Sequence, residues 1–211
     1  GGHPSMMKAA VQAKAEGICF PILLGNPDRI NRQAQRLKLD LSGIEIIDMR
    51  ADKEQGRRAT YTKHLAEKLA RKGYTFQEAY DKMYERNYFG MMMVERGDAD
   101  AFITGLYTKY SNTIKVATEV VGVREGYHTF GTMHIVNSQK GTYYIADTLI
   151  NRHPDNNFLV DIARLNANTV EFFNEKPVMA MISYSNFGTD EIGSPLKVHE
   201  AVEELHTNSP N

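Results

Sequence analysis

Hydrophobic positions along the chain follow two patterns, short continuous runs and longer stretches with helical spacing. The continuous runs, which are typical of buried strands, cover residues 18–24, 44–47, 99–104 and 178–183. Helical spacing or helix-start signals mark the stretches that begin at Pro4, Pro27, residue 58, Thr75, Tyr88, the loop after Gly105, Pro154 and Ser194. Strands separated by helices in this rhythm predict an α/β fold with a mostly parallel sheet and helices on both of its faces.

Local signals place several helix boundaries. Asn26-Pro27 supplies a cap and a first turn for a helix that runs to about Leu37, because proline suits the first helical position. Thr75-x-x-Glu78 has the spacing of a capping box, in which the two side chains bond each other's backbone amides. The run Met91-Met92-Met93 is interpreted as helix core, with a methionine-lined partner surface as the alternative.

The pattern changes near Gly126. Residues 129–136 and 142–146 are rich in β-formers and are joined by Asn137-Ser138-Gln139-Lys140-Gly141, which predicts a hairpin. We therefore expect two subdomains, 1–126 and 127–211. The sequence stops at Asn211, just after a predicted helix and where a sheet would need another strand, so we expect the second subdomain to be truncated.

Composition excludes several classes of protein. Hydrophobic residues make up 42% and charged residues 24% of the 211 positions, which is ordinary for a globular domain. The net charge of −1 gives no electrostatic footprint for nucleic acid or for an anionic membrane. No apolar run reaches the roughly 18 residues of a membrane-spanning helix, and no signal peptide is evident.

The single cysteine, Cys19, lies in the first apolar run. It excludes an internal disulfide, is expected to be a small core residue, and makes the cytoplasm the default compartment. The seven histidines lack the spacing of metal ligands, and the sequence has no phosphate-loop or dinucleotide-binding glycine motif. We therefore expect no metal and no cofactor in this chain.

Polar residues follow three of the predicted strands. They are Thr104, Gly105 and Lys115 after the 99–104 run, Asp147 and Asn151 after the hairpin, and Ser183, Ser185 and Asn186 after the last run. Ligands of open α/β sheets gather at the carboxyl ends of strands, where helix N-termini attract anions. These groups predict a cleft for an anionic ligand, and ordinary helix capping and turn formation are the alternatives.

Several of these segments resemble the phosphate acetyltransferase/butyryltransferase family. The resemblance rests on residues 21–25, on 97–105, on Asp147 with Asn151 and Pro154, and on 178–183. It covers about the first two thirds of the family and implies a three-layer α/β/α fold, of the isocitrate/isopropylmalate dehydrogenase-like, phosphotransacetylase type, with two subdomains. The family reaction transfers an acetyl group between coenzyme A and phosphate.

One branch of the family is more similar, the phosphotransacetylase-like domain of NADP-dependent malic enzymes. The segments that carry this resemblance are residues 86–94, 127–133 and 185–188. It implies a domain that regulates and assembles a malic enzyme and binds acetyl-CoA as an effector through Arg86 and the residues after the three strands. The implied partners are further copies in a homodimer or larger homo-oligomer, and a malic enzyme catalytic domain in the same polypeptide. NADP and a divalent metal are implied for that catalytic domain alone.

The sequence departs from the pattern of active acetyltransferases. The resemblance places Lys115 where active members have an arginine, and Tyr84 at a second arginine position, with Arg86 two residues further on. The serine-arginine segment and the later aspartate of those enzymes are expected beyond the end of this sequence. We therefore assign no catalytic residue. The alternatives are a working phosphate acetyltransferase and a dimerisation scaffold with a vestigial cleft.

Overall fold

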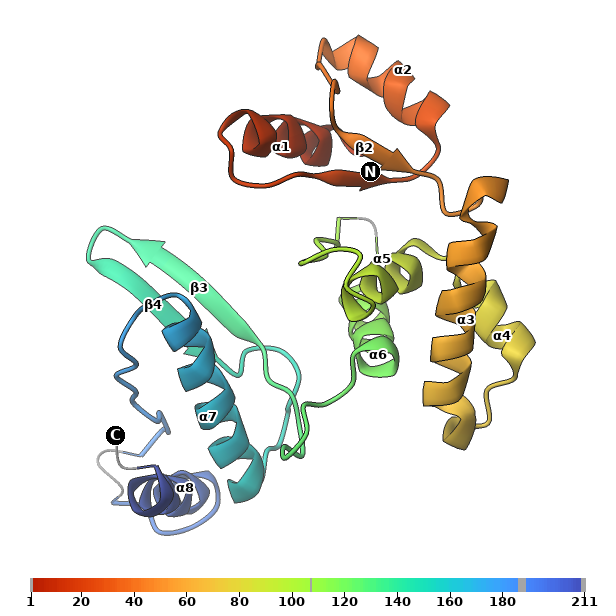
Figure 1. The fold of residues 1–211 in the computed structure, drawn as a ribbon. Helices are drawn as coiled ribbons and strands as arrows, with labels where there is room; N and C mark the ends of the chain where they lie inside the picture. Colours follow the sequence, from red (N-terminus) through yellow and green to blue (C-terminus); the bar gives the residue numbers. More distant parts are fainter. Residues whose placement is uncertain (1, 107, 186–188, 210–211) are drawn as a thin grey trace. The chain divides into compact units, whose positions relative to one another are not determined.

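The computed structural model describes residues 2–106, 108–185 and 189–209. The chain divides into two compact units, Gly1–Gly122 and Val123–Asn211, called here the N-terminal and C-terminal units. The change in sequence pattern at Gly126 lies just after this division. Figure 1 shows the elements of each unit.

The N-terminal unit contains two strands and six α-helices among its described residues. In chain order these are α1 (Pro4–Ala15), β1 (Ile22–Leu24), α2 (Pro27–Leu37), β2 (Glu45–Ile47), α3 (Gln55–Leu69), α4 (Phe76–Lys82), α5 (Arg86–Glu95) and α6 (Tyr110–Val120), with 3-10 turns at Asp52–Glu54 and Ala70–Lys72. Strand β1 pairs with β2 in parallel, Ile22 opposite Glu45 and Leu24 opposite Ile47. The caps at Asn26 and Thr75 form as predicted, the latter as a complete capping box with Glu78.

The short parallel sheet has a hydrophobic cluster on each of its faces. Leu23 belongs to the smaller cluster, with residues of α1 and α2 such as Met7 and Ile30. Leu24 belongs to the larger cluster, which is built mainly from α3, α5 and α6 and includes Leu65. Neighbouring residues of a strand face opposite sides, so this unit has helices above and below its sheet (Figure 1). The expected α/β fold class is confirmed, and in α5 Met92 and Met93 are buried in the core while the partly buried Met91 packs against it.

The C-terminal unit consists of a hairpin and two helices. The hairpin strands β3 (Met133–Ser138) and β4 (Gly141–Ala146) are antiparallel, with Met133 opposite Ala146. Helix α7 (Asn156–Phe172) packs against β4 and α8 (Ser194–Asn208). Asp155 caps α7 by accepting a hydrogen bond from the Phe158 amide at 2.9 Å. The predicted hairpin and both predicted helices are confirmed, except that the first hairpin strand is Met133–Ser138 and residues 129–132 of the expected strand 129–136 precede it.

Three strand predictions need correction. Of residues 18–24, only Ile22–Leu24 pairs with a neighbouring strand. Cys19 is exposed and Phe20 is 95% exposed, so the cysteine is not a core residue. Residues 99–104 and 178–183 form no strand, and the two sheets of the described residues contain only the pairs β1–β2 and β3–β4. An apolar run predicts burial, but a strand also requires a neighbouring backbone.

Over the part of the chain that the structure describes, no helix has both the length and the apolar character needed to cross a membrane.

Candidate functional site

The predicted ligand residues of the N-terminal unit lie on connected elements. Arg86 is the first residue of α5, and its neighbour Asn87 accepts a hydrogen bond from the Thr104 hydroxyl, with 2.8 Å between Oγ1 and Oδ1. Helix α5 packs against α6, which carries Lys115. Gly105 has a φ of +131°, a conformation that favours glycine, and it follows Thr104 at the turn toward α6. Helix α5 therefore contacts both the segment that carries Thr104 and the helix that carries Lys115.

A close helix–segment contact makes this arrangement possible. An added Cβ at Gly90, in the middle of α5, would stand 2.2 Å from the Phe102 ring. Only glycine lets the backbone of α5 approach the ring this closely. Phe102 itself packs against the larger hydrophobic cluster, two residues before Thr104. Gly90 therefore allows the start of α5 to meet the segment with the ligand residues.

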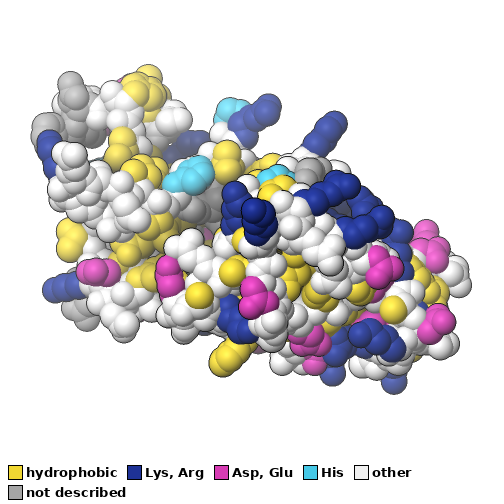
Figure 2. Space-filling model, turned by 90° about the horizontal axis from the view of Figure 1, so that it is seen from above, with side chains coloured by type: hydrophobic (Ala, Val, Ile, Leu, Met, Phe, Trp, Pro, Cys, Tyr) yellow, Lys and Arg dark blue, Asp and Glu magenta, His cyan; other side chains and the backbone are white. Residues whose placement is uncertain are grey.

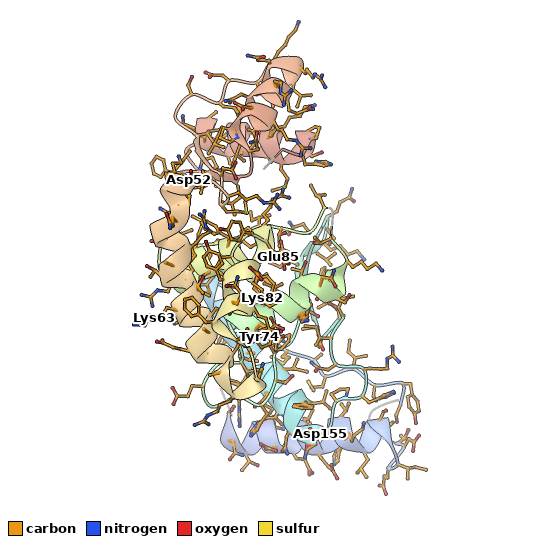
Figure 3. The ribbon with its side chains drawn as sticks, turned by 90° about the vertical axis from the view of Figure 1, so that its right-hand side faces the viewer. Asp52, Lys63, Tyr74, Lys82, Glu85 and Asp155 are labelled. Carbon is orange, nitrogen blue, oxygen red and sulfur yellow. The ribbon has the colours of Figure 1, made fainter. Side chains whose placement is uncertain are left out.

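A buried polar network supports the packing of α5 on α6. The Glu119 carboxylate of α6 accepts hydrogen bonds from the Tyr88 hydroxyl at 2.5 Å and from the Tyr74 hydroxyl at 3.0 Å. Lys82 donates to the Tyr88 oxygen at 3.0 Å and lies over the Tyr88 and Tyr74 rings; Figure 3 labels Tyr74 and Lys82. Burial, reinforced by the Glu119 carboxylate, raises the pKa of both tyrosines. The two hydroxyls therefore remain hydrogen-bond donors.

Lys115, the predicted cation of this site, lies near a carboxylate of its own helix. Its Nζ lies 3.8 Å from Glu119 Oε1, one turn further along α6. The Lys115 side chain is 63% exposed, whereas that of Glu119 is 8% exposed. Because the lysine is long and solvent-facing, its ammonium group can turn toward an anion without disturbing the core.

In the C-terminal unit, Asp147 is surrounded by hydrogen-bond donors. Its Oδ1 accepts bonds from the Thr132 amide (2.8 Å) and hydroxyl (2.5 Å), and its Oδ2 accepts bonds from the Asn151 amide and side chain, both at 2.8 Å. Burial raises the pKa of Asp147, but these donors outweigh burial and hold the pKa below its usual value. A carboxylate whose oxygens are both engaged is a poor general base, so Asp147 orders the loop after β4.

Asn151 ties this loop to the segment that precedes β3. Its side-chain amide also donates to the Phe130 carbonyl at 3.1 Å, and its oxygen lies 3.3 Å from the Thr129 hydroxyl. The structure thus brings Asp147 and Asn151 into direct contact.

Sequence reasoning missed a second carboxylate beside this cluster. Asp161 of α7 is buried, and its Oδ2 accepts a hydrogen bond from the His128 amide at 2.7 Å and lies 3.1 Å from His128 Nδ1. The apolar periodicity of α7 gives no signal for an aspartate on the buried face. The neighbouring segment 127–133 was singled out only by resemblance.

The last predicted group lies after residue 182. The Ser183 hydroxyl accepts a bond from the Ser185 amide at 3.3 Å, and the Ser185 hydroxyl accepts one from the Asp190 amide at 3.0 Å. These contacts are the turn chemistry that was the alternative interpretation. Asn186 lies outside the described residues.

Charge and metal-binding groups complete the description. Figure 2 shows basic and acidic side chains interspersed on one face of the molecule, in keeping with the nearly balanced net charge. Within residues 2–106, 108–185 and 189–209, no three histidine, cysteine or acidic side chains are grouped so that they could hold a metal ion.

Comparison with known proteins decides the family. The sequence of residues 1–211 matches the family described as phosphate acetyl/butaryl transferase. The chain belongs to the phosphate acetyl/butaryl transferase family. The resemblance stated from the sequence is therefore confirmed.

Relatives within this family are of two kinds. The chain is 31% identical to the NADP-dependent malic enzyme of Escherichia coli (strain K12), a match that covers 100% of this chain and 28% of the relative. It is 29% identical to the phosphate acetyltransferase of Bacillus subtilis (strain 168), covering 97% of this chain and 62% of the relative. The chain spans less than two thirds of the length of either relative.

A solved structure agrees with the family assignment. The EutD phosphotransacetylase from Staphylococcus aureus superposes with a TM-score of 0.84 at 27% identity, over 97% of this chain and 61% of that chain. The phosphate acetyl/butaryl transferase fold is thus retained across both units.

Proposed function

We propose that this chain is the regulatory and assembly region of an NADP-dependent malic enzyme and binds acetyl-CoA as an effector without catalysing acetyl transfer. The observation that carries the proposal is the surroundings of Lys115, the candidate cation. Its Nζ lies 3.8 Å from Oε1 of the buried Glu119 carboxylate. An ammonium group is a point charge, whereas a guanidinium binds phosphate through two parallel hydrogen bonds. The site is therefore suited to holding an anion more than to stabilising charge in a transition state.

Two further features support a binding role. Asp147 uses both carboxylate oxygens to hold Thr132 and Asn151, so it supplies no free base for a thiol. The whole chain matches part of a malic enzyme, and the matched part is about a quarter of that protein. A regulatory effect would require acetyl-CoA to bind one assembly state more tightly than another.

The proposed setting follows from the malic enzyme relatives. We place the chain in a homodimer or larger homo-oligomer, in cis to a malic enzyme catalytic domain that oxidises and decarboxylates malate to pyruvate. NADP and a divalent metal would be held by that catalytic domain. The proposed compartment is the cytosol, where a lone cysteine such as Cys19 is kept reduced.

A working phosphate acetyltransferase is the second candidate. It is favoured by the 29% identity to the Bacillus subtilis enzyme and by Arg86, which stands at the start of α5 one residue before the Asn87–Thr104 contact. In this case Arg86 and Lys115 together would bind the phosphoryl group. A scaffold that assembles without binding any ligand is the third candidate.

Calorimetric titration of acetyl-CoA into the chain, with coenzyme A as the comparison, tests the proposal. We expect saturable binding in the micromolar range, about −8 kcal/mol, and a loss of at least tenfold in Lys115→Met. Lys63→Met is the matched control, because Lys63 is an exposed lysine of α3. No heat with either ligand would contradict effector binding and favour the scaffold, which sedimentation would then reveal as an assembly.

An acetyl phosphate assay separates the first two candidates. The assay measures acetyl-CoA formed from acetyl phosphate and coenzyme A, with this chain and with the longest natural form of the protein. We expect no turnover above the rate without protein. Robust turnover that is lost in Lys115→Met would establish the acetyltransferase instead.

A further inference from the structure

We propose that Glu119 is a positioning residue that limits how tightly Lys115 binds a phosphoryl anion. The inference rests on the proposed function, in which Lys115 faces the anionic ligand. It adds a residue that would not contact the ligand and would act only through Lys115. The proposal predicts that removing the Glu119 charge strengthens anion binding, which is the opposite of what damage to a site does.

The Glu119 carboxylate is fixed where it stands. One of its oxygens accepts the Tyr88 hydroxyl at 2.5 Å and the other accepts the Tyr74 hydroxyl at 3.0 Å. Its side chain is 8% exposed, so water screens it little. A carboxylate held by two donors in this way cannot swing away when an anion approaches Lys115.

Lys115 is the mobile member of the pair. Its side chain is 63% exposed and the Nζ–Oε1 distance of 3.8 Å is longer than a hydrogen bond. An arriving phosphoryl group must therefore draw the ammonium from a weak ionic contact and must also approach a fixed negative charge. Lys82 does not relieve this repulsion fully, because its ammonium is engaged by the Tyr88 oxygen at 3.0 Å and by the two tyrosine rings.

The size of the effect follows from the exposure of the lysine. Exposed i,i+4 ion pairs are weak, so abolishing this one should tighten binding of a phosphoryl anion about threefold. Glu119→Gln keeps the side-chain shape and one acceptor oxygen, but it presents an amide to one tyrosine. We therefore expect this variant to have a lower melting temperature and a higher anion affinity at once.

The experiment is a titration of inorganic phosphate into the chain, followed by NMR chemical shifts, for the wild type and three variants. We expect Glu119→Gln to bind phosphate about threefold more tightly and Lys115→Met to lose most of the binding. Tyr88→Phe is the matched control, because it removes a hydrogen bond to Glu119 and keeps the charge. It should lower the melting temperature without tightening phosphate binding.

Each result has one meaning. Weaker or unchanged phosphate binding in Glu119→Gln, together with a loss in Lys115→Met, would overturn the inference and leave the proposed anion site intact. Unchanged binding in Lys115→Met would remove Lys115 from the site and overturn both. If Glu119→Gln does not fold, Glu119→Met combined with Tyr74→Phe and Tyr88→Phe removes the charge together with the two hydroxyls that would otherwise lose their acceptor, and the same tightening is expected.

Discussion

Replacing Gly90 by alanine tests the contact between α5 and Phe102. In an exposed helix interior this change would stabilise by about 0.8–1 kcal/mol, because alanine is the better helix former. Here the new Cβ would stand 2.2, 2.6 and 2.6 Å from three atoms of the Phe102 ring, whereas carbon atoms prefer about 3.5–4.0 Å. Relieving such overpacking costs about 1–3 kcal/mol, so we expect a net destabilisation of about 1 kcal/mol by urea denaturation.

A second substitution shows whether the ring is the cause. In a Phe102→Ala background the space is free, so Gly90→Ala should stabilise by about 1 kcal/mol, which gives a coupling energy of about 2 kcal/mol between the positions. Stabilisation by Gly90→Ala in the wild-type background would refute the close approach. Additive effects of the two changes would place the ring elsewhere.

Three further predictions concern buried or capped polar groups. Lys68→Met should lower the free energy of unfolding by about 1 kcal/mol in urea denaturation, because the Lys68 ammonium caps the last turn of α6 through the Val120 and Val121 carbonyls. The control Lys63→Met should change that free energy little. Asp161→Ala should lower the free energy of unfolding by about 1–3 kcal/mol, since it leaves the part-buried His128 amide without an acceptor. His128→Ala removes only the ring and should lower it less. The depressed pKa of Asp147 contributes stability that is complete above the unfolded-state pKa of about 3.9 and is lost as the pH falls through the folded-state pKa. Asp147→Asn should lack this pH-dependent loss of stability in an acid unfolding titration. An unchanged acid transition in the variant would contradict the hydrogen-bonded carboxylate.

The helices were predictable because their signals are local. Asn26-Pro27 and Thr75-x-x-Glu78 fix helix starts within a few residues, and the structure contains both caps. The runs 99–104 and 178–183 were not strands, because pairing depends on a neighbouring backbone that no local pattern encodes. Phe102 illustrates the difference, since its ring packs on Gly90 while its segment pairs with no strand in the part of the chain that the structure describes.

The candidate site was predictable in part. Asp147 and Asn151 meet because they lie only four positions apart in one loop. The Glu119 network was missed, because it joins Tyr74, Tyr88 and Glu119 from three separate segments. Its members look like ordinary amphipathic positions in the sequence, and only tertiary packing brings their hydroxyls to one carboxylate.

The unequal clusters on the two faces of the β1–β2 sheet imply unequal resistance to local opening. The smaller cluster holds α1 and α2 on the sheet through a few side chains such as Met7 and Ile30, whereas the larger one joins α3, α5 and α6. Segments with few buried apolar contacts open at the lowest free energy, so amide protons of α1 should exchange with solvent before those of α5. Arg86 and Lys115 lie on the helices of the larger cluster, so the proposed anion site should stay folded while α1 opens transiently.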